Sequence, residues 1–221
     1  MRIKCIIFDF DGTLFDSMFI WDDAGEKYLR SLGRKPKPSM REDLQALSLY
    51  QSACYFKEEY GLALSVDEVM EGISQTVGYF YIHEAKPKEG VGRFLEEVKQ
   101  SGISMCIATA NERSLVEAAL RRCGIEHFFD AVFTCTEVGC GKDEPVIFRR
   151  AMEYFHADRS STIIFEDAYH AVWTAKADGF MAAAVYDESE KRQSEIQQLC
   201  DCYLTDFKHV EHFWKFAAEK H

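Results

Sequence analysis

The sequence has no hydrophobic run that approaches the roughly 20 apolar residues needed to cross a bilayer. Its apolar start, residues 1–8, meets Asp9 where the apolar core of a secretory signal peptide would have to continue. We therefore expect neither a membrane span nor a membrane partner, and a cytoplasmic location.

CxxC pairs are also absent, although the chain has eight cysteines. The cysteines are scattered, and several lie in apolar runs that resemble strands, so we expect free, mostly buried thiols in a reducing compartment. A zinc site built from Cys135, Cys140 and a distant histidine stays open as an alternative, but the spacing of these ligands is wrong for one.

Positive charge is in short supply, because 26 Lys and Arg face 37 Asp and Glu and the formal net charge is -11. A surface this negative repels nucleic acids and anionic membranes, so we expect neither as a partner. A site for an anionic substrate would then need local positive charge from a metal ion, a lysine or helix N-termini.

Five short apolar runs indicate strands that are covered on both faces. They span residues 3–10, 103–109, 131–135, 162–165 and 181–185. Four segments with helical spacing lie between or after them, at residues 91–101, 115–123, 146–155 and 168–178. This alternation predicts an α/β fold, with a Rossmann-like parallel sheet sandwiched by helices.

Residues 16–85 interrupt the alternation and contain no convincing buried strand. Loops of this length without structure are uncommon, and the apolar residues recur with helical spacing. We predict a helical cap domain over residues 16–85, inserted into a core domain of residues 1–15 and 86–221. Asp16 and Ser17 are predicted to cap the first cap helix, with a hinge role as the alternative.

Two carboxylates follow the first predicted strand, in the string Asp9-Phe10-Asp11-Gly12-Thr13-Leu14. Side chains at positions i and i+2 of a strand point the same way, and ligands bind at the carboxyl ends of strands in open α/β sheets. Two acids this close favour a cation beside them. Taken alone, however, Asp-x-Asp-Gly is also an ordinary turn sequence.

This string resembles the first motif of the haloacid dehalogenase superfamily, and three further stretches match that family in order along the chain. Thr109 is similar to the family's phosphate-binding Ser or Thr, Lys142 to its lysine, and Glu166-Asp167 to its magnesium-binding acids. The helical insertion resembles the cap of the branch that contains phosphoglycolate phosphatase and β-phosphoglucomutase. Each stretch is ambiguous alone, and their joint order carries the resemblance.

The resemblance implies a Mg²⁺-dependent phosphatase that hydrolyses a small phosphate monoester, such as a sugar phosphate, through an aspartyl-phosphate. Asp9 would be the nucleophile, and Asp11 would be the general acid and then the general base. Asp9, Asp167 and the main-chain carbonyl of Asp11 would hold the Mg²⁺, with Glu166 in an outer position or bound through water.

The phosphate oxygens would be held by the Thr109 hydroxyl, the Lys142 ammonium and the main-chain N–H groups of the loop that includes Ala110 and Asn111. Local departures from the family occur at Ala168 and Ala171, where Ser and Gly are frequent, and after Lys142, which Pro does not directly follow. His170 is a candidate for a site role, with an exposed loop histidine as the alternative.

Other activities of the family are open alternatives. Asp11 disfavours a dehalogenase, which lacks an acid at that position. A phosphonatase would need a cap lysine in an apolar pocket, and none is obvious among Lys27, Lys35, Lys37 and Lys57. A β-phosphoglucomutase-like mutase is the main alternative, although residues 47–50, Leu-Ser-Leu-Tyr, lack the Arg-rich segment associated with it. A non-catalytic phosphometabolite-binding protein is disfavoured because no catalytic residue is missing.

The cap sets the choice of substrate in this branch. Its candidates to face the substrate are Phe19, Trp21, Asp22, Asp23 and Tyr28, with packing of the aromatic residues inside the cap as the alternative. A cap that closes limits the size of the substrate, so we expect a small phosphorylated metabolite as the partner. We expect a monomer or a weak homodimer.

Overall fold

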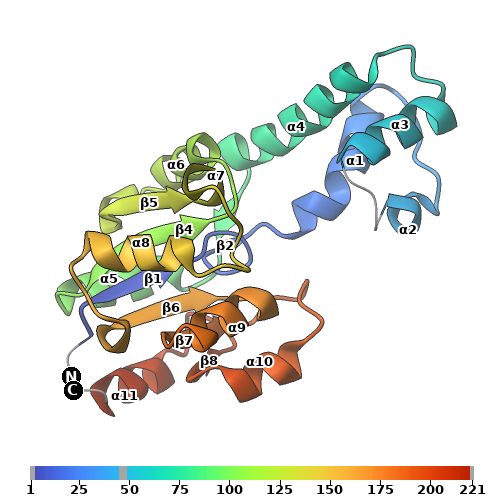
Figure 1. Cartoon of the computed structure of the whole chain (residues 1–221). Coiled ribbons are helices and arrows are strands. Elements are labelled where there is room, and N and C mark those ends of the chain that lie inside the picture. Colours follow the sequence, from blue (N-terminus) through green and yellow to red (C-terminus); the bar gives the residue numbers. More distant parts are fainter. Residues whose placement is uncertain (1–2, 45–48, 220–221) are drawn as a thin grey trace. The chain divides into compact units, whose positions relative to one another are not determined.

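The computed structural model describes residues 3–44 and 49–219 (Figure 1). The chain divides into two compact units, one up to Ser17 and again from Ala85 onward, the other Met18–Glu84. The second unit begins at Met18 and ends at Glu84, whereas the predicted cap domain spans residues 16–85. We call the first unit the core and the second the cap.

The core contains a six-stranded parallel sheet in the order β5-β4-β1-β6-β7-β8. Its strands are β1 (Cys5–Phe8), β4 (Ser104–Thr109), β5 (Ala131–Thr134), β6 (Thr162–Glu166), β7 (Met181–Val185) and β8 (Cys202–Leu204). The first five agree with the predicted strands to within two residues at each end. The sequence does not reveal β8, because three residues are too few to show a hydrophobic period.

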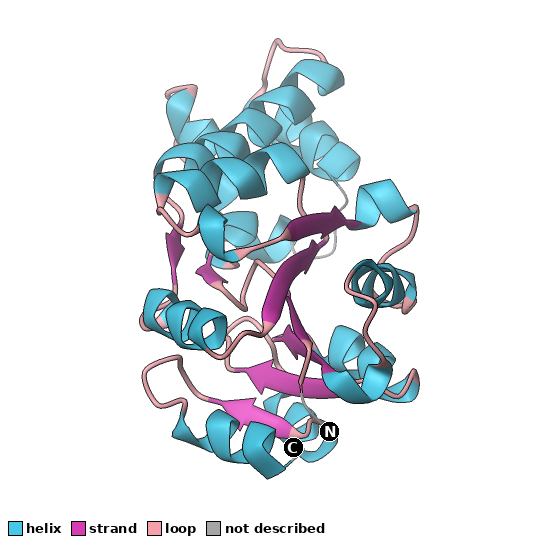
Figure 2. Cartoon of the chain, turned by 90° about the vertical axis from the view of Figure 1, so that its left-hand side faces the viewer, coloured by secondary structure: helices cyan, strands magenta, loops and turns pink. Residues whose placement is uncertain are grey.

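Helices cover both faces of this sheet (Figure 2). They are α5 (Val91–Gln100), α6 (Arg113–Arg122), α7 (Cys135–Val138), α8 (Val146–Tyr154), α9 (Tyr169–Ala177), α10 (Gln193–Leu199) and α11 (Glu211–Glu219), with short 3₁₀ helices at Glu126–Phe128 and Arg159–Ser161. On β1, Ile7 packs into one apolar cluster with Phe148 of α8, whereas Phe8 contacts Phe94 of α5. The strand is therefore buried on both sides, which confirms the predicted α/β fold.

The chain leaves and re-enters the core through a two-stranded antiparallel sheet, in which β2 (Phe15–Asp16) pairs with β3 (Lys86–Pro87). This pairing overturns the prediction that Asp16 and Ser17 cap the first cap helix. Asp16 belongs to β2, and the N-cap position is Met18, which has no capping side chain. The Ser17 hydroxyl instead donates to Asp11, a contact that no local capping rule reveals.

The cap consists of α1 (Phe19–Ser31), α2 (Met40–Leu44), α3 (Leu49–Tyr60) and α4 (Val66–His83) among the residues that the structure describes. Tyr28 is buried against Gly72 of α4, where an added Cβ would collide with the Tyr28 ring. Tyr28 therefore belongs to the interior of the cap, whereas Phe19 and Trp21 are 44% and 53% exposed. The side chain of Asp22 and residues 47 and 48 lie outside the described part of the chain.

All eight cysteines are free, but only Cys5, Cys106 and Cys202 are buried. The expectation of mostly buried thiols is wrong because the other five, which are partly buried, lie in helices, at helix ends or in a loop. Within residues 3–44 and 49–219, no Cys–His group with metal-binding geometry occurs, so the zinc alternative finds no cluster there. None of the described helices is long and apolar enough to cross a membrane.

Candidate active site

The carboxyl ends of three central strands bring the predicted site residues to one edge of the sheet. Phe8, the last residue of β1, pairs with Ile107 of β4 on one side and Phe165 of β6 on the other. The main-chain N–H of Asp9 continues this pairing by donating to the carbonyl oxygen of Phe165 at 2.9 Å. The residues that follow these strands therefore meet, although more than 50 positions separate any two of the three segments.

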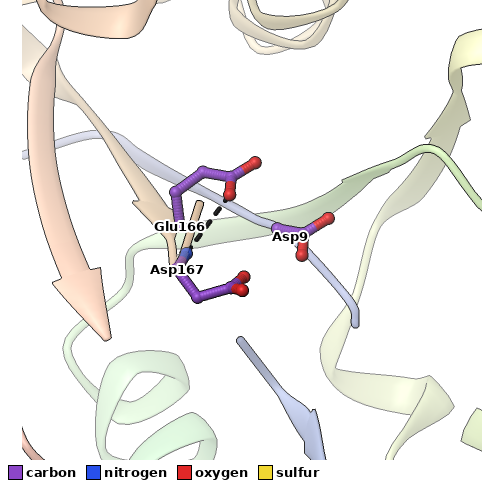
Figure 3. Close-up of side chains that lie close together, drawn as sticks. All are labelled: Asp9, Glu166 and Asp167. Carbon is purple, nitrogen blue, oxygen red and sulfur yellow. Dashed lines mark hydrogen bonds between the residues drawn. The ribbon is translucent and has the colours of Figure 1, made fainter. Parts of the chain in front are cut away.

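Asp9, Glu166 and Asp167 form a buried acidic cluster at this edge (Figure 3). Each residue offers one carboxylate oxygen, and these three oxygens lie within 4.8 Å of one another. Gly12, with φ of 75°, leaves room for the Asp167 carboxylate, which any Cβ at that position would strike. The Thr13 hydroxyl donates to Asp167 Oδ1 at 2.8 Å and fixes its orientation.

Lys142 is 7% exposed, and its ammonium group contacts two members of the cluster. Its Nζ donates to Asp9 Oδ1, and to Glu166 Oε1 at 2.6 Å. The other Glu166 oxygen accepts the main-chain N–H groups of Asp167 at 3.2 Å and Ala168 at 3.4 Å. Glu166 therefore holds Lys142 beside Asp9, and its predicted part in metal binding stays a prediction.

Burial, together with the crowding of negative charge, shifts the pKa values of the cluster. Burial raises the pKa of Glu166 to about 7, even though the Lys142 charge opposes the shift. Burial, followed by the charge of Asp9, raises the pKa of Asp167 well above its usual range. For Lys142, burial lowers the pKa, but the charges of Asp9 and Glu166 outweigh burial and hold the pKa above its ordinary value.

A divalent cation with a preference for oxygen ligands fits this donor set. Carboxylate oxygens are the ligands that Mg²⁺ prefers, and its positive charge would favour the ionised carboxylates against the burial and the repulsion that raise their pKa values. Asp9 and Asp167 are the best candidates to bind it directly, since Lys142 and main-chain N–H groups already occupy both oxygens of Glu166.

Two side chains hold the Asp11 carboxylate. Asn111 Nδ2 donates to Asp11 Oδ2 at 2.8 Å, and Ser17 Oγ donates to Asp11 Oδ1 at 2.5 Å. Both carboxyl oxygens thus accept a hydrogen bond, so Asn111 and Ser17 together fix the orientation of the Asp11 side chain. Asn111 comes from the loop after β4, so the contact links two of the predicted motifs.

Three of the four predicted phosphate-binding residues, Thr109, Ala110 and Asn111, lie at the end of β4 and in the loop that leads to α6. Thr109 is fully buried, and its Oγ1 accepts the main-chain N–H of Asn111 at 3.0 Å, while Ala110 is exposed. The first turn of α6 follows directly after Glu112. Phosphate binding by Thr109, Ala110, Asn111 and Lys142 stays a prediction, which this placement at the same edge of the sheet supports.

Several residues lie differently from expectation or were not foreseen. His170 is exposed in the first turn of α9 and is not a member of the acidic cluster. Pro145 is the N-cap residue of α8, so the departure after Lys142 only lengthens the loop before that helix. The contact of Thr13 with Asp167 was not predicted, because the two residues are 154 positions apart and only the fold joins them.

The parallel sheet with a buried acidic cluster and a buried lysine at its carboxyl edge defines a class, the α/β enzymes that act at that edge. Comparison with known proteins makes the class specific. The family model described as haloacid dehalogenase-like hydrolase matches residues 3–179. The chain belongs to this family of hydrolases.

Relatives and solved structures agree with this assignment. The chain is 30% identical over 191 residues to the pyrophosphatase PpaX of Bacillus velezensis, covering 83% of each chain. It is 23% identical over 177 residues to a phosphorylated carbohydrates phosphatase of Thermotoga maritima, covering 80% of this chain and 82% of the relative. A crystal structure from the same organism, named provisionally as a β-phosphoglucomutase, has a TM-score of 0.84 at 21% identity and covers 96% of this chain and 98% of its own. That last likeness concerns the fold alone.

Proposed function

We propose that the protein is a Mg²⁺-dependent phosphatase that hydrolyses a small phosphate monoester, such as a sugar phosphate, by way of an aspartyl-phosphate on Asp9. The observation that carries this proposal is the buried cluster of Asp9, Glu166 and Asp167 with the Lys142 ammonium on Asp9. The names of two relatives, a pyrophosphatase and a phosphorylated carbohydrates phosphatase, support phosphoryl chemistry.

Asp9 and Asp167, with the main-chain carbonyl of Asp11, would hold the Mg²⁺. When bound, the ion supplies positive charge that offsets the repulsion between a phosphate dianion and the carboxylates. Lys142 adds a second positive charge at Asp9, where it would also contact a phosphate oxygen. These two positive charges would let a protein of negative net charge bind an anionic substrate at this site.

The reaction then has two steps, and Asp9 and Asp11 act in both. Asp9 attacks phosphorus and forms a P–O bond, the bond from phosphorus to the leaving oxygen breaks, and Asp11 gives that oxygen a proton. In the second step, Asp11 takes a proton from a water molecule as the water attacks phosphorus. The bond between phosphorus and Asp9 breaks, which releases phosphate and restores both carboxyl groups to their starting states.

A mutase that transfers the phosphoryl group to a second position on a sugar is the alternative. The mutase would need a positively charged segment near residues 47–50 to hold a second phosphate. Leu49 and Tyr50, the first residues of α3, are exposed and carry no positive charge. Measurement of free phosphate and of isomerised sugar phosphate from the same reaction separates the two activities.

Hydrolysis of a generic aryl phosphate and of a panel of small phosphorylated metabolites tests the proposal. We expect activity that EDTA abolishes and Mg²⁺ restores, and a loss of at least about 1,000-fold in Asp9→Asn. Asp201→Asn is a matched control, because Asp201 lies before β8, at the opposite edge of the sheet. Equal rates for Asp9→Asn and the unmodified protein would overturn the proposal.

A further inference from the structure

A fourth buried carboxylate lies beside the acidic cluster, on the loop after β7. Strands β6 and β7 are parallel neighbours, and Glu166 pairs with Ala184, so Asp167 lies level with Val185. Asp187 follows two residues later and is 7% exposed. Asp187 therefore lies at the same carboxyl edge of the sheet as Asp167, on the neighbouring strand's loop.

Asp187, which is buried, forms an ion pair with the partly buried Lys88. Lys88 Nζ lies 2.9 Å from Asp187 Oδ2, and the two side chains are only 16% and 9% exposed. Lys88 Nζ also donates to the carbonyl oxygen of Tyr186 at 2.6 Å. The other oxygen of Asp187 accepts the main-chain N–H of Ser189 at 3.0 Å and its hydroxyl at 2.6 Å. Both oxygens of Asp187 therefore accept hydrogen bonds or contact a positive charge.

Lys88 belongs to the linker by which the chain returns from the cap, directly after β3. Its main-chain N–H donates at 2.8 Å to the carbonyl oxygen of Leu14, in the loop that begins with Asp9. The residue therefore joins three segments of the core: the loop after β1, the linker after β3 and the loop after β7. A tie of this kind would stabilise the fold whether or not the cluster binds a cation.

When Asp9, Glu166 and Asp167 are ionised and Lys142 is protonated, the acidic cluster with its lysine carries two negative charges, and the ion pair of Asp187 with Lys88 adds none. We propose that Lys88 and Asp187 are a positioning pair that sets the charge at the cation site, an inference that rests on the proposed function because it needs Mg²⁺ at Asp9 and Asp167. The positive charge of Lys88 cancels the negative charge of Asp187, and this balance sets the affinity of the site for the cation.

This role predicts effects of opposite sign for the two partners. Lys88→Met leaves the Asp187 charge uncancelled, so Mg²⁺ should bind more tightly, on the order of 3- to 10-fold. Asp187→Asn leaves the Lys88 charge uncancelled, so Mg²⁺ should bind more weakly by a similar factor. The double variant removes both charges and should bind Mg²⁺ within about twofold of the unmodified protein.

Titration calorimetry of the full chain with MgCl₂, without substrate, measures these dissociation constants directly. Lys88→Arg keeps the charge and should leave the constant unchanged, which also guards against variants that fold poorly. Lys176→Met is the matched control, because Lys176 forms a partly buried pair with Asp201 at 2.6 Å at the amino end of the sheet. That variant should also leave Mg²⁺ binding unchanged.

Shifts in the same direction for Lys88→Met and Asp187→Asn, or no shift in either, would overturn the inference and leave a purely structural tie. Failure of the proposed function gives a different result, since the unmodified protein would then show no Mg²⁺ binding. The inference is established if Mg²⁺ binds more tightly to Lys88→Met, more weakly to Asp187→Asn, and with nearly unchanged affinity to the double variant.

Discussion

Buried charges that would be unfavourable one at a time are grouped at the site so that they compensate one another. Three carboxylates whose oxygens lie within 4.8 Å repel, and a single ammonium, that of Lys142, contacts two of them. Burial first, and the neighbouring carboxylates after it, raise the pKa values of Glu166 and Asp167, and a bound cation would oppose both effects. Each residue of the cluster is therefore best tested through its charge.

The pKa of Glu166 predicts how the stability of the protein depends on pH. Its value rises from the ordinary 4.5 to about 7 on folding, so the folded state binds this proton more tightly than the unfolded state. Stability in EDTA should therefore be fully present below the unfolded pKa and fall as pH rises toward about 7. Thermal melting at several pH values in EDTA measures this slope.

Excess Mg²⁺ should reduce that loss of stability, because the cation favours the ionised carboxylates. Glu166→Gln should flatten the slope in EDTA, since the titrating group is gone. A melting temperature that rises through the same pH window in EDTA, for the unmodified protein, contradicts the assignment of the raised pKa.

The two hydrogen bonds to Asp11 predict a dependence on the leaving group. Ser17→Ala removes one donor to Asp11, so the carboxylate is held less well for proton transfer and kcat on alkyl phosphates should fall about tenfold. An aryl phosphate with a good leaving group needs little protonation and should be affected much less. Steady-state rates on the two kinds of ester measure the difference.

Ser17→Thr keeps a hydroxyl and serves as the control for that experiment, because it should restore most of the alkyl phosphatase rate. An equal loss on alkyl and aryl phosphates would show that Ser17 supports the fold instead of proton transfer by Asp11.

At the residue scale, the sequence predicts the members of the site better than their contacts. Asp9, Glu166 and Asp167 were identified by motif, and the structure brings them together. Ser17 was assigned to a helix cap and instead contacts Asp11, and the contact of Thr13 with Asp167 went unforeseen. Both contacts depend on how the loop after β1 turns, and no periodic pattern encodes that turn.

At the scale of elements, two helical glycines test whether close packing or helix propensity decides stability. Gly72 of α4 faces the Tyr28 ring so closely that any Cβ would collide with it, whereas Gly92 of α5 has open space around its Cα. Gly72→Ala should therefore lower the free energy of unfolding by about 1–3 kcal/mol through overpacking of the cap.

Gly92→Ala should raise the free energy of unfolding by up to about 1 kcal/mol, because alanine favours the helix and nothing obstructs it. Urea denaturation of both variants measures the difference. The same sign of change in the two variants would contradict the packing argument, since the substitution itself is identical.

The elements that the sequence predicts well are the long or strongly periodic ones. The five predicted strands and the helices α5, α6, α8 and α9 agree with the structure to within two residues at each end. The short elements β2, β8 and α7 were not predicted. Each has two to four residues, so tertiary pairing and caps such as Thr134 of α7 determine them.

At the scale of the whole molecule, the net charge of -11 opposes the attraction that the site exerts on phosphate. A small phosphate ester is attracted by the positive charges of the site. A polyanion is in addition repelled by the negative surface around the site. We predict that phosphate release from a sugar phosphate exceeds release from a terminally phosphorylated DNA oligonucleotide by at least about 100-fold at low salt.

Added salt should narrow this difference, because screening weakens the repulsion of the oligonucleotide. A comparison of the two rates at low and high ionic strength checks the prediction. Preference for the oligonucleotide at low salt would contradict it and would point to a basic surface that the composition does not supply.

The central claim is that Asp9 accepts the phosphoryl group, and rapid acid quenching during turnover of an aryl phosphate tests it most directly. Mass spectrometry of the digested protein should find one added phosphoryl group on the peptide that contains Asp9, and none in the Asp9→Asn variant. Turnover with no phosphorylated peptide, or with the phosphoryl group on another residue, would contradict the account.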